Sequence, residues 1–314
     1  MTRLFYTDAY ALPLPDGHKF PIGKYRMLRE LLEGSGEFQF QAAQMAERET
    51  VELIHDPDYV EAFLKGTLSD SVMRRIGFPW SEGLVKRTLA SVGGTLAATE
   101  EALESGWGGT LAGGTHHAFA AEGSGFCVFN DIAVAIAWLR KQDKIRRAAV
   151  IDLDVHQGDG TAHIFRHDPN VLTLSVHCRN NFPLRKQQSK IDVELEARTG
   201  DEEYLRLLDS VLPRVAEFKP EIVFYQSGVD GLQSDRLGRL SLTHAGLRER
   251  DRRVMEAVRV PLVITLGGGY SDPIALTAQA HASTFLTAKE VFDRGKTSLR
   301  LKAEMPGWER RNIR

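Results

Sequence analysis

The sequence predicts an α/β protein with a mostly parallel central sheet. Short β-branched runs that end beside glycine alternate with longer helical stretches, and no internal repeat or low-complexity linker interrupts them. The strand-like runs are apolar almost throughout, which is typical of strands buried on both faces. With 314 residues, 42% of them hydrophobic, the chain can enclose a large core. We therefore expect one folded unit over residues 1–293, followed by a basic, partly ordered tail over residues 294–314.

Four runs are the clearest strand candidates. Each is short, apolar and followed by a turn signal; they cover residues 148–155, 171–176, 221–225 and 261–266. Helices are expected between them. Residues 201–218 show helical spacing of apolar side chains behind Asp201, a candidate N-cap, and residues 243–258 form a second helix capped by Thr243. A third helix follows Asn130 and Asp131.

Several classes of protein are disfavoured. The longest uninterrupted apolar run, residues 132–139, is far shorter than the roughly 20 residues needed to cross a bilayer, and residues 1–14 lack the core of a signal peptide. Cys127 and Cys178 are too few for a disulfide framework. A net charge of −2 provides no field that recruits nucleic acid. We expect a cytoplasmic protein without a membrane or nucleic-acid partner.

The segment from Asp152 to Asp159 carries the strongest chemical signal. Its two-residue alternation places Asp152, Asp154 and His156 on one face of the expected strand. Buried carboxylates are costly unless they are paired or bind a metal, and the carboxyl end of a strand is where α/β proteins place their sites. Asp154 and His156 could supply an oxygen and a nitrogen to one ion. A structural ion-pair cluster is the alternative.

Two adjacent histidines form the second signal. His116 and His117 follow a Gly-Gly turn and could act as bases if Asp152 and Asp159 orient them. A solvated or packed pair is the plainer interpretation of this segment alone.

The ends of two further strands complete the pattern. Asp230, which stands beside glycines after the 221–225 strand, would complete a three-ligand site with positions open for water and substrate, unless it caps a turn or a helix. Tyr270 follows three glycines, which indicates that the backbone approaches another group closely and presents the phenol at its edge; a packed tyrosine in a flexible turn is the alternative. Together the segments provide a metal triad, a base and an electrophile at one edge of the sheet.

In their order and spacing, these segments resemble the zinc-dependent histone deacetylase family from about His18 to Ser271. The motifs are Gly113-Gly114-Thr115-His116-His117-Ala118, Gly125-Phe126-Cys127-Val128-Phe129-Asn130-Asp131, residues 152–160, Ser227-Gly228-Val229-Asp230 and Gly267-Gly268-Gly269-Tyr270-Ser271. Residues 18–21, 75–80 and 181–186 are most similar to class IV deacetylases and their bacterial relatives. The resemblance implies the arginase/deacetylase fold, a single-domain three-layer α/β/α arrangement with a sheet of about eight strands, and makes residues 1–293 a deacetylase catalytic domain.

The same resemblance implies roles for individual residues. The zinc ligands would be Asp154, His156 and Asp230. The catalytic groups would be His116 and His117, oriented by Asp152 and Asp159, with Tyr270 polarising the substrate carbonyl. The substrate channel would comprise Gly125, Phe126, Phe182 and Gly268, with the two aromatic rings on either side of an acyl-lysine stem. A potassium ion, which family members often bind, would use Asp152, Asp154, His156 and Ser175.

A comparison with the arginase-like binuclear manganese enzymes favours one metal per chain. Those enzymes carry bridging carboxylates at positions that correspond here to Gly158 and Gly228, and glycine cannot bind a metal through a side chain. The expected ion is Zn²⁺, although a carboxylate-rich site could also hold Fe²⁺ or Co²⁺.

We expect a hydrolase of a linear amide bond that removes an acetyl or other acyl group from lysine side chains by attack of a metal-activated water. Two alternatives stay open: a deacetylase of small acylated amines such as acetylpolyamines, and a non-catalytic module that binds acyl-lysine. A module that only binds would not need all three ligands, both histidines and the tyrosine. The sequence carries no signal for an oligomeric state or for the acyl chain length.

Overall fold

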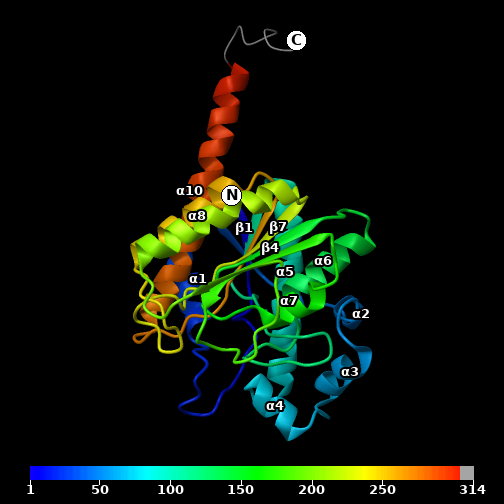
Figure 1. The fold of residues 1–314 in the computed structure, drawn as a ribbon. Helices are drawn as coiled ribbons and strands as arrows, with labels where there is room; N and C mark the ends of the chain where they lie inside the picture. The colour runs from blue at the N-terminus through cyan, green and yellow to red at the C-terminus, as the bar shows by residue number, and fades with distance from the viewer. Residues whose placement is uncertain (305–314) are drawn as a thin grey trace.

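The computed structural model describes the backbone of residues 1–304 and the side chains of residues 1–293. Its centre is one sheet in the order β2-β1-β3-β8-β7-β4-β5-β6, in which all neighbouring strands are parallel (Figure 1). The strands are β1 (Arg3–Tyr6), β2 (Gln39–Ala42), β3 (Trp107–Thr110), β4 (Ala148–Asp152), β5 (Val171–Cys178), β6 (Ile191–Leu195), β7 (Ile222–Gln226) and β8 (Leu262–Thr265). The predicted parallel α/β fold with about eight strands is confirmed.

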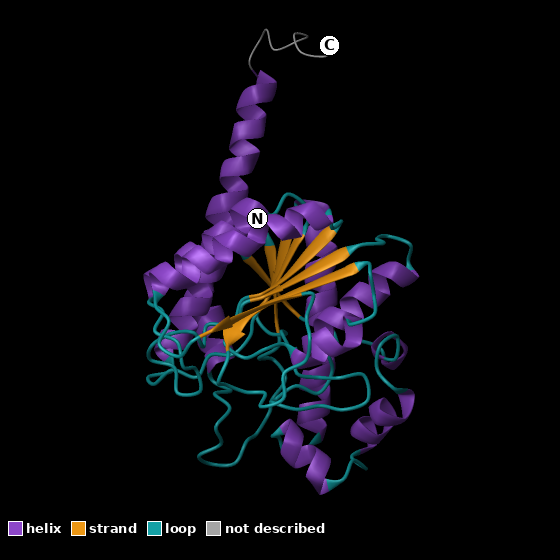
Figure 2. Ribbon diagram, in the orientation of Figure 1, coloured by secondary structure: helices purple, strands orange, loops and turns teal. Residues whose placement is uncertain are grey.

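Helices cover both faces of the sheet (Figure 2). On one face, α5 (Glu82–Ser105) packs on β1, β3 and β8 and contacts α6 (Asp131–Lys141). On the other face, α1 (Lys24–Ser35), α10 (Ala275–Glu304), α9 (His244–Ala257) and α8 (Asp201–Phe218) pack side by side. The remaining described helices are α2 (Arg48–Val51), α3 (Pro57–Lys65), α4 (Asp70–Ile76) and α7 (Asp159–Phe165).

Alternate residues of the central strands contribute to two separate cores. Ile151 and Tyr225 pack with residues of α1, α8, α9 and α10, whereas Val150 and Phe224 pack with residues of α5 and α6. Because both faces of the sheet are buried, the strands need apolar side chains on both sides. This explains the uninterrupted apolar runs in the sequence.

The predicted strands are present with shifted ends. Residues 171–176, 221–225 and 261–266 correspond to β5, β7 and β8. The strand predicted over 148–155 was too long, because pairing of β4 with its neighbours stops where Asp152 lies opposite Ser175 and Gln226.

Side-chain acceptors replace strand partners beyond that point. The backbone N–H of Asp154 donates to Asp152 Oδ1 at 3.1 Å, and that of His156 donates to Asp154 Oδ1 at 3.0 Å. Asp154 and His156 therefore lie in a bend after β4, and the expectation that they share a strand face with Asp152 was wrong.

The helix predictions hold except for one cap. Residues 201–218 form α8, Asn130 caps α6, and Thr243 caps α9 by accepting from the Gly246 N–H at 3.0 Å. The N-cap of α8 is Gly200 rather than Asp201. The Asp201 carboxylate instead accepts from the Thr243 N–H at 2.9 Å and the Thr243 hydroxyl at 2.6 Å, which joins the starts of α8 and α9.

The expected boundary at residue 293 falls inside α10, which continues to Glu304. Residues 305–314 of the predicted basic tail lie outside the described residues, and the division into 1–293 and 294–314 stays a prediction. None of the helices in residues 1–304 combines the length and the apolar character that a bilayer crossing requires.

Candidate metal centre and active site

The loops that follow β3, β4, β7 and β8 meet at the carboxyl edge of the sheet. Neighbouring strands end in register, with Asp152 opposite Gln226 and Gln226 opposite Thr265. Because the strands are parallel, the chain leaves all of them at the same edge. The segments that the sequence analysis singled out are therefore brought together.

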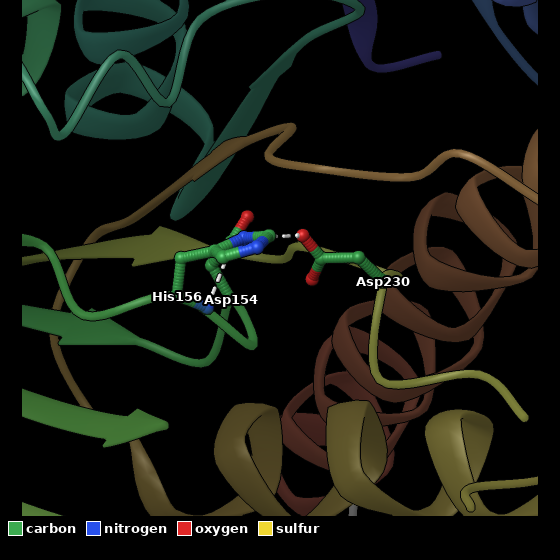
Figure 3. A group of neighbouring side chains, drawn as sticks. All are labelled: Asp154, His156 and Asp230. Atoms are coloured by element: carbon green, nitrogen blue, oxygen red, sulfur yellow. Dashed lines mark hydrogen bonds and ion pairs between the residues drawn. The ribbon is translucent and has the colours of Figure 1, made fainter. Parts of the chain in front are cut away.

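Asp154, His156 and Asp230 form a buried cluster (Figure 3). His156 Nδ1 lies 3.0 Å from Asp154 Oδ1 and 3.1 Å from Asp230 Oδ2. One ligand atom from each residue can be chosen so that all three lie within 4.8 Å of one another. Among residues 1–293, no lysine or arginine forms an ion pair with either carboxylate. These three side chains could hold one metal ion.

Protein donors satisfy the two carboxylates only in part. Asp154 Oδ2 accepts from the Gly268 N–H at 2.5 Å, and Asp230 Oδ1 accepts from the Val155 N–H at 2.9 Å. Asp230 Oδ2 is buried and, among residues 1–293, accepts no well-aligned hydrogen bond, although His156 Nδ1 lies 3.1 Å from it. Burial and the negative charge of Asp154 raise the pKa of Asp230 to about 7. A buried, under-coordinated carboxylate oxygen beside an imidazole nitrogen is chemically suited to a divalent cation.

The tandem histidines each contact one of the carboxylates expected to orient them. His116 Nδ1 lies 2.7 Å from Asp152 Oδ2, and His117 Nδ1 lies 2.6 Å from Asp159 Oδ1. Burial lowers the pKa of His116, but Asp152 and Asp154 outweigh it and raise that pKa to about 9. Burial, followed by the charge of His116, lowers the pKa of His117 to about 4. At neutral pH the pair therefore combines a charged and a neutral imidazole.

Tyr270 is held through its backbone. Its N–H donates to Asp235 Oδ2 at 2.6 Å, and Arg236 Nε donates to its carbonyl oxygen at 3.2 Å. Burial, together with the charges of Asp230 and Asp154, raises the pKa of Tyr270 well above its usual value. The phenol therefore keeps its proton and can act as a hydrogen-bond donor.

One cavity is lined by Asp154, His156, both tandem histidines and Tyr270. Three of the expected channel residues also line it, namely Gly125, Phe126 and Gly268. The Phe126 ring lies 5.3 Å from the Phe78 ring and 6.2 Å from the Tyr270 ring, between centroids. Phe182 is not among the lining residues: its ring lies edge-on to His117 at 4.8 Å and is 40% exposed.

The residues expected to bind potassium are neighbours. Ser175 and Asp152 are buried and paired in the register of β5 and β4, and Asp154 and His156 follow directly after β4. The Ser175 hydroxyl lies 3.0 Å from His177 Nδ1. The bound ion itself stays a prediction.

Buried charges outside the expected set also shape the site. Asp131, which the sequence analysis placed at the start of a helix and at the end of a family motif but gave no role in the site, accepts from the Gly114 N–H at 3.0 Å and the Thr115 N–H at 2.8 Å, and so fixes the turn before His116. Lys24, the first residue of α1, donates to the Gly267 carbonyl oxygen at 3.1 Å. The motif that ends at Asp131 could have indicated its role, whereas Lys24 has no signal in the sequence that distinguishes it from an ordinary charge at a helix end.

A parallel eight-stranded sheet with this site at its carboxyl edge is the arginase/deacetylase fold. The histone deacetylase domain matches residues 18–286, and the chain belongs to this family.

Relatives of the chain come from several kingdoms of life. An uncharacterized protein of Picosynechococcus sp. is 43% identical over 294 residues, which cover 91% of this chain and 98% of that protein. Histone deacetylase 2 of Arabidopsis thaliana is 38% identical over 186 residues, 57% of this chain and 48% of that protein. A probable deacetylase of Archaeoglobus fulgidus is 33% identical over 212 residues, 62% of this chain and 59% of that protein.

Proposed function

We propose that this chain is a metal-dependent amidohydrolase that removes acyl groups from lysine side chains. The observation that carries the proposal is the buried cluster of Asp154, His156 and Asp230, which adjoins the cavity lined by both tandem histidines and Tyr270. Membership of the histone deacetylase family supports a deacetylase, and two of the similar proteins are named as deacetylases.

The residues present fit one divalent metal ion. Two carboxylates and one imidazole form the donor set, and Asp230 Oδ2 has no other partner among the described residues. A Cβ atom at Gly228 would lie 2.4 Å from Asp154 Oδ2, and one at Gly158 would lie 2.2 Å from Asp152 Oδ2. Bridging carboxylates therefore do not fit at these positions, which supports one ion rather than two. The proposed ion is Zn²⁺, and the donor set also suits Fe²⁺ or Co²⁺.

When bound, such an ion polarises a carbonyl and lowers the pKa of a coordinated water to about 7. The histidines handle the proton. Nδ1 of His117 is hydrogen-bonded to Asp159, so Nε2 is the nitrogen that is free to take part in proton transfer. It would accept a proton from the attacking water and return it to the departing amine. His116, paired with Asp152, contributes positive charge beside it, and the two imidazoles act as a coupled pair.

The remaining groups act on the substrate. The Tyr270 hydroxyl donates to the acyl oxygen as negative charge develops there. Gly125, Phe126 and Gly268, which line the cavity, would flank the lysine stem and orient the amide, and Phe182, edge-on to His117, would be the second aromatic ring beside the stem. Asp152, Asp154, His156 and Ser175 would hold a second ion, the monovalent potassium.

Replacing Tyr270 with Phe is expected to lower turnover at least tenfold without loss of metal, because an oxyanion donor contributes on the order of 3 kcal/mol to the transition state. The measurement is kcat on an acetyl-lysine peptide, together with elemental analysis of the dialysed protein. Tyr204→Phe is the matched control, since Tyr204 is also a buried tyrosine but does not line the cavity. Near-normal turnover of Tyr270→Phe would contradict the assigned role.

The charge of the expected rim supports acyl-lysine over acetylpolyamines. Acidic residues crowded at the rim would favour a polycation, but the loops 15–25, 76–81 and 187–192 contain only two acidic residues, beside two lysines other than the buried Lys24. Assays of an acetyl-lysine peptide beside acetylspermidine, each with and without chelator, test the proposal directly. Hydrolysis of acetylspermidine but not of the peptide would mean that the substrate is a small acylated amine rather than acyl-lysine. Hydrolysis that continues in the presence of the chelator would contradict metal dependence.

Phe126→Ala is expected to reduce kcat/KM more for acyl-lysine peptides than for small acylated amines, because the ring forms a wall of the cavity where a lysine stem would pass. Both substrates are measured on the same variant, so a general loss of folded protein affects them equally. Equal losses on both would count against a ring that grips the stem.

A further inference from the structure

We propose that the inner part of the catalytic cavity binds a carboxylate, and that the chain therefore prefers acyl groups that end in a carboxylate, such as malonyl and succinyl, over uncharged acyl groups of the same shape. This inference rests on the proposed function and names the acyl group for it. It is carried by Lys24 and Arg87, two buried cations that line the cavity.

Neither cation has an anionic partner among the side chains of residues 1–293. Lys24 is 1% exposed and Arg87 is 7% exposed. Lys24 Nζ donates to the Gly267 carbonyl oxygen at 3.1 Å, and an Arg87 guanidinium nitrogen donates to Thr7 Oγ1 at 3.1 Å. Within residues 1–293, no carboxylate lies within 4.0 Å of either cationic group. A buried cation compensated only by neutral groups is costly, so an anion that entered here would be stabilised.

The two cations share one aromatic ring. Lys24 Nζ lies 5.3 Å from the centroid of the Tyr25 ring, and Arg87 Cζ lies 4.1 Å from it. Contacts of this type offset only part of the cost of burying each ion. The ring therefore holds two like charges in one region without neutralising them.

The rest of the inner wall also suits an anion. Asp154 provides the only carboxylate among the described cavity-lining residues, and it belongs to the proposed metal triad. Ser91 Oγ accepts from the Gly113 N–H at 3.1 Å, which leaves the Ser91 hydroxyl proton free to donate. Lys24, Arg87 and Ser91 are thus donors that line a cavity in which, among the described residues, Asp154 is the only carboxylate.

Lys24 is close to the proposed reaction centre. Lys24 Nζ lies 5.4 Å from the centroid of the Tyr270 ring and bonds to Gly267, the neighbour of the Gly268 that holds Asp154. With the acyl oxygen at the Tyr270 hydroxyl, one or two methylene groups would carry a terminal carboxylate toward Lys24. The reaction remains amide hydrolysis: the C–N bond breaks, the water oxygen joins the acyl carbon, and the products are the lysine amine and malonate or succinate.

The test compares matched acyl groups on one lysine peptide. Succinyl is paired with 4-methylpentanoyl, which has the same shape without the charge, and malonyl with 3-methylbutanoyl. We expect the wild-type chain to favour the charged member of each pair at least tenfold in kcat/KM. Lys24→Met and Arg87→Met should each reduce this ratio at least tenfold, whereas Lys24→Arg should retain most of it. Arg26→Met, in the same helix at a side chain that is 74% exposed, is the matched control and should leave the ratio unchanged.

Carboxylate binding is also measured without turnover, by calorimetric titration of the metal-free chain with succinate and with uncharged succinamide. We expect binding of succinate alone, and its loss in Lys24→Met. A wild-type preference for the uncharged acyl groups, or a ratio that neither Met variant changes, would overturn the inference. If succinate binds but no acyl-lysine peptide is hydrolysed, the proposed function fails and the carboxylate site stands; equal binding of succinate and succinamide would overturn the site.

Discussion

Asp230→Ala is expected to abolish stable metal binding and to lower turnover on an acyl-lysine peptide more than about 100-fold. Loss of an outer-shell partner typically costs about 10–100-fold in metal affinity or activity, and Asp230 is proposed as a direct ligand. Its carboxylate also accepts the Val155 N–H at 2.9 Å, between the two other proposed ligands. The change would therefore remove one donor and loosen the bend that presents the other two.

Metal content and stability distinguish this metal site from a structural ion-pair cluster. A metal that binds only the native state stabilises it, so a chelator should lower the Tm of the wild-type chain and leave that of Asp230→Ala unchanged. Asp168→Ala is the control, because Asp168 pairs with Arg140 and does not line the cavity. The cluster would be a structural ion-pair cluster if the wild-type protein carries no metal after dialysis against micromolar Zn²⁺ and its Tm does not change when chelator is added.

The fold was predictable because its signals are local. Strands such as β7 and β4 are buried on both faces, so each is a short apolar run in the sequence. Parallel pairing then brings the carboxyl ends together, which allowed Asp154, Asp230 and Tyr270 to be grouped although they are far apart in the chain. The end of β4 was misplaced because carboxylates accept the backbone N–H groups of Asp154 and His156, an interaction that alternation alone does not reveal.

The buried charges around the site were missed for a different reason. Lys24 bonds to Gly267, 243 residues away, and a lysine at a helix start is ordinarily exposed. Arg250 stands in α9 among several other arginines and glutamates, yet it is fully buried. Burial of such residues depends on tertiary packing, whereas composition and spacing report only the local pattern.

Asp251→Ala is expected to lower the free energy of unfolding by about 3–5 kcal/mol, because it leaves the buried guanidinium of Arg250 without its carboxylate. Asp251 Oδ1 accepts from Arg250 Nε at 2.9 Å and from the Tyr225 hydroxyl at 2.5 Å, and Asp251 Oδ2 accepts from the Thr284 hydroxyl at 2.7 Å. Both charged side chains are 1% exposed. The pair therefore lies in a region where solvent cannot compensate a lost partner.

The Arg250–Asp251 pair also supports the loops of the proposed metal centre. An Arg250 guanidinium nitrogen donates to the Gly228 carbonyl oxygen at 2.6 Å and to the Leu153 carbonyl oxygen at 3.3 Å. These carbonyls belong to the loops that carry Asp230 and Asp154, so Asp251→Ala should also weaken metal affinity.

Urea denaturation at fixed metal concentration measures the stability loss, and Asp209→Ala is the control. Asp209 of α8 pairs with Arg253, which lies in α9 like Asp251, but the Asp209 side chain is 53% exposed, so its removal should cost no more than about 1 kcal/mol. The combined replacement Arg250→Met with Asp251→Leu should cost less than Asp251→Ala alone, because it leaves no unpaired charge behind. Equal losses of unfolding free energy for Asp251→Ala and Asp209→Ala would mean that the Arg250–Asp251 pair does not hold together the loops that carry Asp154 and Asp230.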